Sequence, residues 1–160
     1  MYRTGHYGAA LLVYAPVGGA LLGAGFGGAA LVGGAVAVGL SGLPDVDQRI
    51  PFVEHRGATH TVGFLVLVGL AVAAAGVAVA RATPVEAVTV GAFGFLVGAL
   101  AIGSHLLADA LTPMGIAPLW PVSDAHYTLS LTRADNAVAN YLLLGLGVAV
   151  TAATALVAGG

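Results

Sequence analysis

The sequence contains no cysteine and no lysine, and only 8% of its residues are charged. Without cysteine the chain can form no disulfide and can offer no thiolate, so a bound metal ion would need nitrogen and oxygen ligands. A net charge of −2 and the lack of a basic run exclude an electrostatic surface for nucleic acid. About a quarter of the residues of a soluble domain are charged, so this composition excludes an ordinary water-soluble fold.

Hydrophobic residues make up 59% of the chain, and the mean hydropathy is +0.99. A transmembrane helix needs about 20 apolar residues, so a chain of this length has room for about five and for no separate soluble domain. We therefore predict an all-α, polytopic membrane helical bundle in contact with membrane lipid, built as one integral domain over residues 1–160. The predicted apolar segments are about 7–23, 26–40, 60–80, 85–108 and 137–158.

The first apolar stretch, residues 7–40, would be about 51 Å long as one helix, which exceeds the roughly 30 Å hydrocarbon core. The dense glycines at 23–28 predict a reversal there, because glycine tolerates the backbone angles of a tight turn. The two halves would then be either thin spans or a re-entrant hairpin. A signal peptide that follows Arg3 is a competing interpretation.

The remaining segments have recognisable boundaries. Thr59 is available as an N-cap for the third segment, and the Thr-Pro pair at 112–113 ends the fourth. Alternate threading places the N-terminus and the polar loops 41–59 and 109–136 on one side of the membrane. Because four arginines go to that side and one to the other, the positive-inside rule predicts that it is cytoplasmic. The four are Arg3, Arg49, Arg56 and Arg133, and the one is Arg81.

The same side also collects the histidines and aspartates, although they are scattered along the sequence. Such a distribution predicts a single assembled site, and it argues against an ionisable path through the bilayer. These residues are His6, Asp45, Asp47, His55, His60, His105, Asp109, His126 and Asp135.

Individual motifs are weaker than this distribution. His105 and Asp109 are four residues apart, so on a helix both can grip one ion, although a plain interfacial polar pair fits the spacing too. Asp45 and Asp47 favour one ligand and one supporting or bridging carboxylate; the alternative is a solvated turn. His60 faces the bundle more readily than His55.

The other polar residues have supporting or neutral interpretations. Arg56 suits a phosphate or a ligating carboxylate, or simply lipid headgroups. Ser104 and Thr112 are candidate hydrogen-bond partners of the ligands. We interpret His126 and Asp135 as loop residues, and Glu86 as an interfacial partner of Arg81.

Three motifs in order resemble the YdjM-type family of membrane-bound metal-dependent hydrolases. They are LPDVD at 43–47, HRGATHT at 55–61 and SHLLADALTPMG at 104–115. The resemblance covers most of the chain, from His6 to about Pro121, and it implies a metal-dependent hydrolase in the cell membrane. It marks a metal set with Arg56 beside it: His6, Asp45, Asp47, His60, His105 and Asp109.

These observations predict hydrolysis of a phosphoester or other ester of a lipid or lipid-linked substrate by a metal-activated water. Zinc is the first choice of metal and manganese the second, as one or two ions. Asp47 or Asp109 would act as general base, and Arg56 would stabilise developing negative charge. The alternatives are a small metal or proton transporter and a metal-stabilised structural membrane protein.

Overall fold

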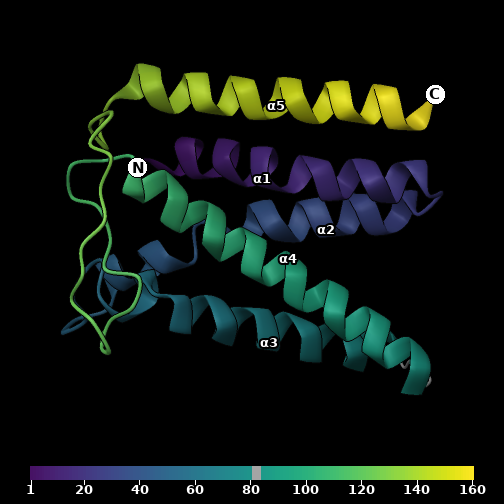
Figure 1. The fold of residues 1–160 in the computed structure, drawn as a ribbon, viewed down its shortest axis with the longest axis horizontal. Coiled ribbons are helices and arrows are strands. Elements are labelled where there is room, and N and C mark those ends of the chain that lie inside the picture. The colour runs from purple at the N-terminus through teal and green to yellow at the C-terminus, as the bar shows by residue number, and fades with distance from the viewer. Residues whose placement is uncertain (81–83) are drawn as a thin grey trace.

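The computed structural model describes residues 1–80 and 84–160, and it is all-helical (Figure 1). Among these residues the β-structure consists of one isolated antiparallel bridge between Ile116 and Tyr127. The long helices are α1 (Arg3–Gly23), α2 (Gly27–Leu40), α3 (Val62–Ala80), α4 (Pro84–Ala110) and α5 (Ala137–Gly159), and two short 3-10 helices are η1 (Pro44–Arg49) and η2 (Ala58–His60).

The helices are long and apolar enough for five membrane crossings, which confirms the predicted fold class. The second of these candidate spans, Gly27–Arg49, joins α2 to η1, because α2 alone has 14 residues. Helices α1 and α4 extend beyond the predicted apolar limits, to Arg3 and to Ala110, since the polar residues at these ends continue the helices. The chain reverses at the predicted glycines, where Gly25 adopts a φ of 82°.

Close glycine contacts hold the bundle together. Helix α1 packs along α5, and a Cβ on Gly8 or Gly147 would collide with the backbone of the other helix. Helix α3 packs along α4 in the same way, with Gly98 against the backbone of Gly69. Small residues at such crossings let membrane helices approach closely, and here they fix the positions of α1 and α4.

Tyr14 connects three helices. Its ring packs in a buried cluster with Ala37 of α2 and with Val97 and Ala101 of α4, and its hydroxyl donates to the Ala30 carbonyl at 2.9 Å. A buried hydroxyl needs such a partner. Helix α4 runs diagonally between the α1–α2 pair and α3 (Figure 1), and Tyr14 thereby ties it to α1 and α2.

The N-cap of α3 differs from the prediction. Thr61, rather than Thr59, accepts the backbone N–H of Phe64 at 3.1 Å, and its hydroxyl donates to the Ala58 carbonyl at 2.8 Å. Thr59 lies in η2, and so does His60, which places that imidazole before the helix begins. The sequence offers two threonines close together, and the η2 turn selects the second.

The N-terminus, the 41–61 segment and the 111–136 loop lie at one end of the bundle, and the C-terminus lies at the other (Figure 1). The 111–136 loop folds back onto the end of α4, where Leu129 N–H donates to the Ala110 carbonyl at 2.7 Å and Leu131 N–H to the Leu111 carbonyl at 2.8 Å. These bonds satisfy carbonyls that a helix end leaves unpaired.

Candidate metal centre

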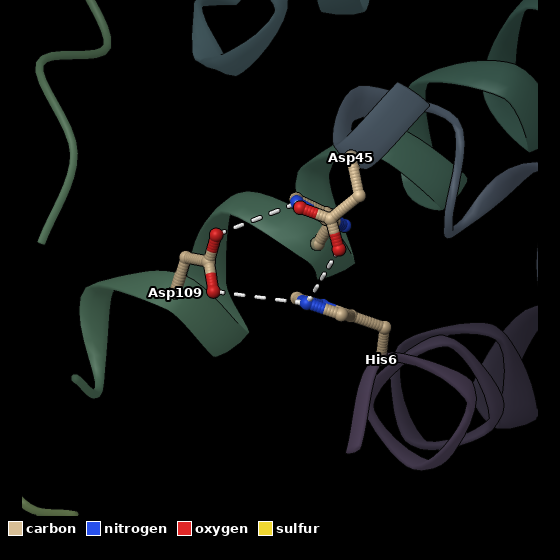
Figure 2. Close-up of side chains that lie close together, drawn as sticks. His6, Asp45 and Asp109 are labelled. Carbon is tan, nitrogen blue, oxygen red and sulfur yellow. Dashed lines mark ion pairs between the residues drawn. The ribbon is translucent and has the colours of Figure 1, made fainter. Parts of the chain in front are cut away.

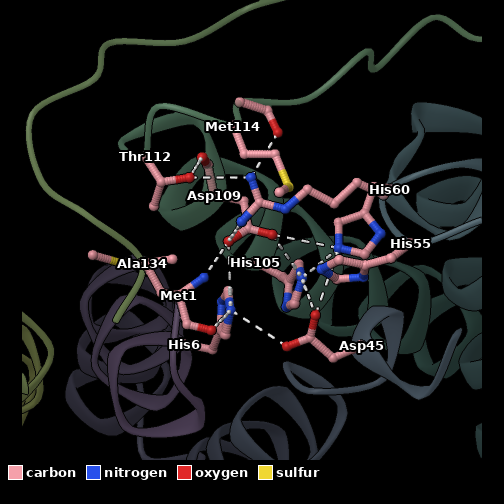
Figure 3. Close-up of polar contacts among 12 residues, drawn as sticks. Met1, His6, Asp45, His55, His60, His105, Asp109, Thr112, Met114 and Ala134 are labelled. Carbon is pink, nitrogen blue, oxygen red and sulfur yellow. Dashed lines mark hydrogen bonds and ion pairs between the residues drawn. The ribbon is translucent and has the colours of Figure 1, made fainter. Parts of the chain in front are cut away.

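Five ionisable side chains from four segments meet inside this end of the bundle (Figure 3). Helix α1 supplies one imidazole, η1 one carboxylate, η2 one imidazole, and α4 an imidazole and a carboxylate one turn apart. Both α4 side chains and the other two imidazoles are fully buried, whereas the η1 carboxylate keeps 25% of its side-chain surface exposed. The five are His6, Asp45, His60, His105 and Asp109.

Asp109 faces all three imidazoles through their Nε2 atoms. Its Oδ2 lies 3.4 Å from His60 Nε2 and 3.4 Å from His105 Nε2, and its Oδ1 lies 3.7 Å from His6 Nε2. The His60 and His105 Nε2 atoms are themselves 3.1 Å apart. Three nitrogen atoms of the same kind therefore converge on one carboxylate.

Asp45 faces the same three nitrogens from the opposite side. Its Oδ2 lies 3.6 Å from His6 Nε2, and its Oδ1 lies 3.7 Å from His60 Nε2 and 3.8 Å from His105 Nε2. Figure 2 shows Asp45 and Asp109 on either side of the space toward which His6 points.

These separations fit a shared cation. Two atoms that each lie about 2.1 Å from one tetrahedral ion are about 3.4 Å apart. In the described part of the chain, Asp109 Oδ2 is buried without a hydrogen-bond partner, although two imidazoles face it. Ligand atoms within 4.8 Å of one another form two groups that could hold a metal ion: His6, Asp45, His105 and Asp109, and Asp45, His55 and His60.

The opposite nitrogen of each imidazole is consistent with this role. His105 Nδ1 donates to the Ser41 carbonyl at 2.7 Å, which leaves its Nε2 lone pair available. His60 Nδ1 lies 3.0 Å from Thr59 Oγ1 and 3.3 Å from Asp47 Oδ2. His6 Nε2 lies 3.1 Å from the Met1 carbonyl, a contact that needs a proton on Nε2. His6 Nδ1 has no partner among the described residues, so it can carry the proton instead when Nε2 binds a metal.

The structure places Asp47 behind His60. Its Oδ1 lies 2.9 Å from His55 Nδ1, and its Oδ2 accepts from the Thr59 hydroxyl at 2.7 Å and from the Arg56 N–H at 3.2 Å. Both oxygens are thus engaged with residues that surround the cluster. Asp47 as a direct ligand and as a general base stays a prediction.

Arg56 contacts a cluster carboxylate, which is one of the three interpretations that the sequence left open. Nη2 donates to Asp109 Oδ1 at 2.9 Å, while Nη1 donates to Thr112 Oγ1 at 3.0 Å and to the Gly115 carbonyl at 2.9 Å. The expected support from Thr112 is therefore indirect. Ser104 does not support the cluster, because its hydroxyl donates to the Ala101 carbonyl of its own helix at 2.8 Å.

Two groups that contact the cluster were not predicted from the sequence. The Met1 α-amino group forms an ion pair with Asp109 Oδ1, and the Ser41 carbonyl orients His105. One is the terminal amino group of the chain and the other is a backbone carbonyl, so neither is marked by a residue type in the sequence. The N-terminal segment is held by Asn140 of α5, a fully buried side chain that accepts the Tyr2 N–H at 3.0 Å.

His60 lies outside the candidate spans. Burial alone would lower the pKa of this imidazole, but the facing carboxylates of Asp109 and Asp45 outweigh burial and raise the pKa above its usual range. The surroundings of His60 therefore favour a positive charge at this position, which is what a cation also needs.

The weaker candidates lie apart. His126 is exposed, and its Nε2 lies 2.6 Å from the Met114 carbonyl, while Asp135 pairs with Arg133 at the surface. Arg81 falls outside the described residues, and so does its predicted pairing with Glu86.

Fold and site together define a polytopic all-α membrane protein with a buried histidine–aspartate cluster that could hold a metal ion. The sequence profile of the YdjM inner membrane protein family matches residues 1–159, so the chain belongs to that family. No curated protein and no solved structure matches the chain.

Proposed function

We propose that this protein is a metal-dependent hydrolase that acts on a phosphoester or other ester of a lipid or lipid-linked substrate. The observation that carries the proposal is the convergence of three imidazole Nε2 atoms and two carboxylates at spacings of 3.4 to 3.8 Å. Buried ionisable groups are costly unless they are paired or bind a cation. Their assembly from four separate segments supports a functional site.

The ligand chemistry supports zinc first and manganese second, because nitrogen and carboxylate oxygen suit both ions. His6, Asp45, His60, His105 and Asp109 exceed what one tetrahedral ion needs. The second group that could hold a metal consists of Asp45, His55 and His60. This group supports the proposal that the site can take a second ion.

The surrounding residues have distinct proposed roles. A bound divalent ion would supply an activated water and polarise the scissile group. Asp47 fixes the ring of His60, since it contacts Nδ1 and leaves Nε2 for the metal. Arg56 holds Asp109 in place and brings positive charge beside the site, which favours a transition state that gains negative charge.

An apolar groove supports a lipid substrate. A cavity of about 590 Å³ lies between α2, α3 and α4, with Leu40 and Leu43 at one end and Val79 and Val90 at the other. Leu43 is two residues before Asp45, so the groove begins near the cluster. A chain of methylene groups would lie in the groove with its polar end toward the metal.

We also propose that the site end of the bundle is one membrane face and that it is cytoplasmic. The described arginines Arg3, Arg49, Arg56 and Arg133 all belong to segments at that end. Cytoplasmic loops carry an excess of such residues.

The two alternatives are less well supported. Helices α3 and α5 contain no Asp, Glu, Lys, Arg or His, so nothing in them marks an ion path of the kind a transporter uses. A purely structural metal site is closed, whereas the Asp45 side chain is 25% exposed.

A hydrolysis assay tests the proposal. The purified protein is stripped with a chelator, reloaded with zinc or manganese, and offered a phosphomonoester, a phosphodiester and a neutral ester. We expect turnover with metal, loss without it, and loss in Asp45→Asn, with Asp135→Asn as the matched surface control. A metal-loaded protein that hydrolyses none of the three would contradict the proposal.

A further inference from the structure

A second cavity, of about 410 Å³, lies where the N-terminal residues meet η1. We call it the Arg3–Arg49 cleft; it is lined by Met1, Tyr2, Arg3, Gly42, Asp45, Val46, Gln48 and Arg49. Asp45 is the one cluster residue in this lining. The other four cluster side chains are at most 1% exposed, so among the five it is Asp45 that a molecule in the cleft can reach.

Two arginines give the Arg3–Arg49 cleft its charge. Both are exposed, and neither has an ion pair with a carboxylate in residues 1–80 and 84–160. By contrast, Arg56 pairs with Asp109 and Arg133 with Asp135. Unpaired guanidinium groups beside a metal-binding carboxylate suit an anion, because guanidinium binds phosphate oxygens in a bidentate way.

The larger cavity on the other side of the cluster is less suited to an anion. It measures about 720 Å³, and its lining includes the carboxylates of Glu54 and Asp124. Arg56, which also lines it, already uses both terminal nitrogens on Asp109, Thr112 and Gly115.

From this asymmetry we infer that Arg3 and Arg49 form a phosphate-binding subsite, through which a phosphoester reaches the cluster at Asp45. The inference rests on the proposed function and names its substrate class: a phosphate ester rather than a neutral ester. The phosphate belongs to a lipid headgroup or to a soluble phosphoester, and both present the same oxygens to the two guanidinium groups.

Phosphate binding tests the subsite without any need for turnover. Inorganic phosphate is titrated by calorimetry into the zinc-loaded protein, as parent, as Arg3→Gln/Arg49→Gln and as Arg3→Lys/Arg49→Lys. Arg133→Gln is the matched control, since Arg133 is exposed on the same end. Zinc content is measured in each variant. Removing two solvent-accessible guanidinium–phosphate interactions together should weaken phosphate binding about tenfold.

We expect that weakening in the glutamine pair, most of the affinity in the lysine pair, and no change in Arg133→Gln, all at unchanged zinc content. Equal phosphate affinity in parent and glutamine pair, or no phosphate binding by the parent, would overturn the subsite. A repeat with dihexanoyl phosphatidic acid identifies the source: tighter binding than phosphate assigns a lipid headgroup, and equal binding a soluble ester. If the protein binds phosphate at this subsite but hydrolyses none of the esters, the subsite stands and the proposed function fails, so the two claims are tested separately.

Discussion

The imidazole rings of His6 and His105 stack face to face, with centroids 3.8 Å apart and planes within 9° of parallel. One ring comes from the first turns of α1 and the other from the last turns of α4. Stacking brings both Nε2 atoms to Asp109, at 3.7 and 3.4 Å. The cluster therefore exists because α1 and α4 pack together, and helix packing and metal binding should be linked.

Metal content is the most direct prediction. In the double variant His105→Ala, Asp109→Ala, one nitrogen and one carboxylate are gone, so we expect the stoichiometric zinc or manganese of the parent to be lost. Elemental analysis of the detergent-solubilised protein measures this. Because a ligand that binds the folded state stabilises it, a chelator should lower the melting temperature of the parent and leave that of the double variant unchanged.

His126→Ala is the matched control for this measurement, since His126 is exposed and lies outside the cluster. It should keep the parent's metal content. A parent that stays metal-free after reconstitution would return the five side chains to the status of interfacial polar groups.

The sequence predicts the helices and the end of the bundle that carries the ionisable residues for a simple physical reason, whereas the choice of a metal set among them rests on the family resemblance. Lipid requires apolar spans, so hydropathy locates the helices, and the few ionisable residues stand out against them. What fails is local. The α3 cap moves from Thr59 to Thr61, and Ser104 bonds within its own helix. The Ser41 carbonyl and the terminal amino group of Met1 belong to no side chain, so their contacts with the cluster follow from tertiary packing and are not marked by a residue type.

Asp47→Asn should weaken metal binding without abolishing it. The carboxylate contacts His60 Nδ1, and loss of such an outer partner typically costs about 10- to 100-fold in metal affinity. Competition with a chromogenic chelator measures the dissociation constant. Asp45→Asn, which removes a proposed ligand, should weaken binding more than Asp47→Asn does. Equal losses would instead favour Asp47 as a ligand.

Metal affinity should fall as the pH is lowered, and the fall should begin above pH 6.5, the ordinary imidazole value. The sign follows from competition: a metal binds the neutral ring, and the carboxylates of Asp109 and Asp45 raise the pKa of His60, so its proton is already bound at a higher pH. Zinc titrations between about pH 5.5 and 8 test this. An affinity that does not change over this range would argue against His60 as a ligand.

Topology follows from the span count. With five crossings, a reporter fused after Gly160 should lie on the opposite side of the membrane from one inserted in the 111–136 loop. Alkaline phosphatase, which is active outside the cytoplasm, and a fluorescent protein, which is bright inside it, report the two locations. Both reporters on one side would contradict the five-span arrangement.

Two glycines of α5 test the link between packing and site. Gly147 faces the α1 backbone, where a methyl group would collide with Gly8, whereas Gly145 has open space around it. Gly147→Ala should push α5 away from α1, disturb the contact of Asn140 with Tyr2, and so loosen the segment that carries His6. Gly145→Ala should be neutral or slightly stabilising, since alanine favours a helix by roughly 0.5–1 kcal/mol over glycine.

Melting temperature and zinc content are measured together: we expect both to fall in Gly147→Ala and neither in Gly145→Ala. A Gly147→Ala protein that melts lower yet keeps full zinc content would show that the cluster does not depend on the α1–α5 contact.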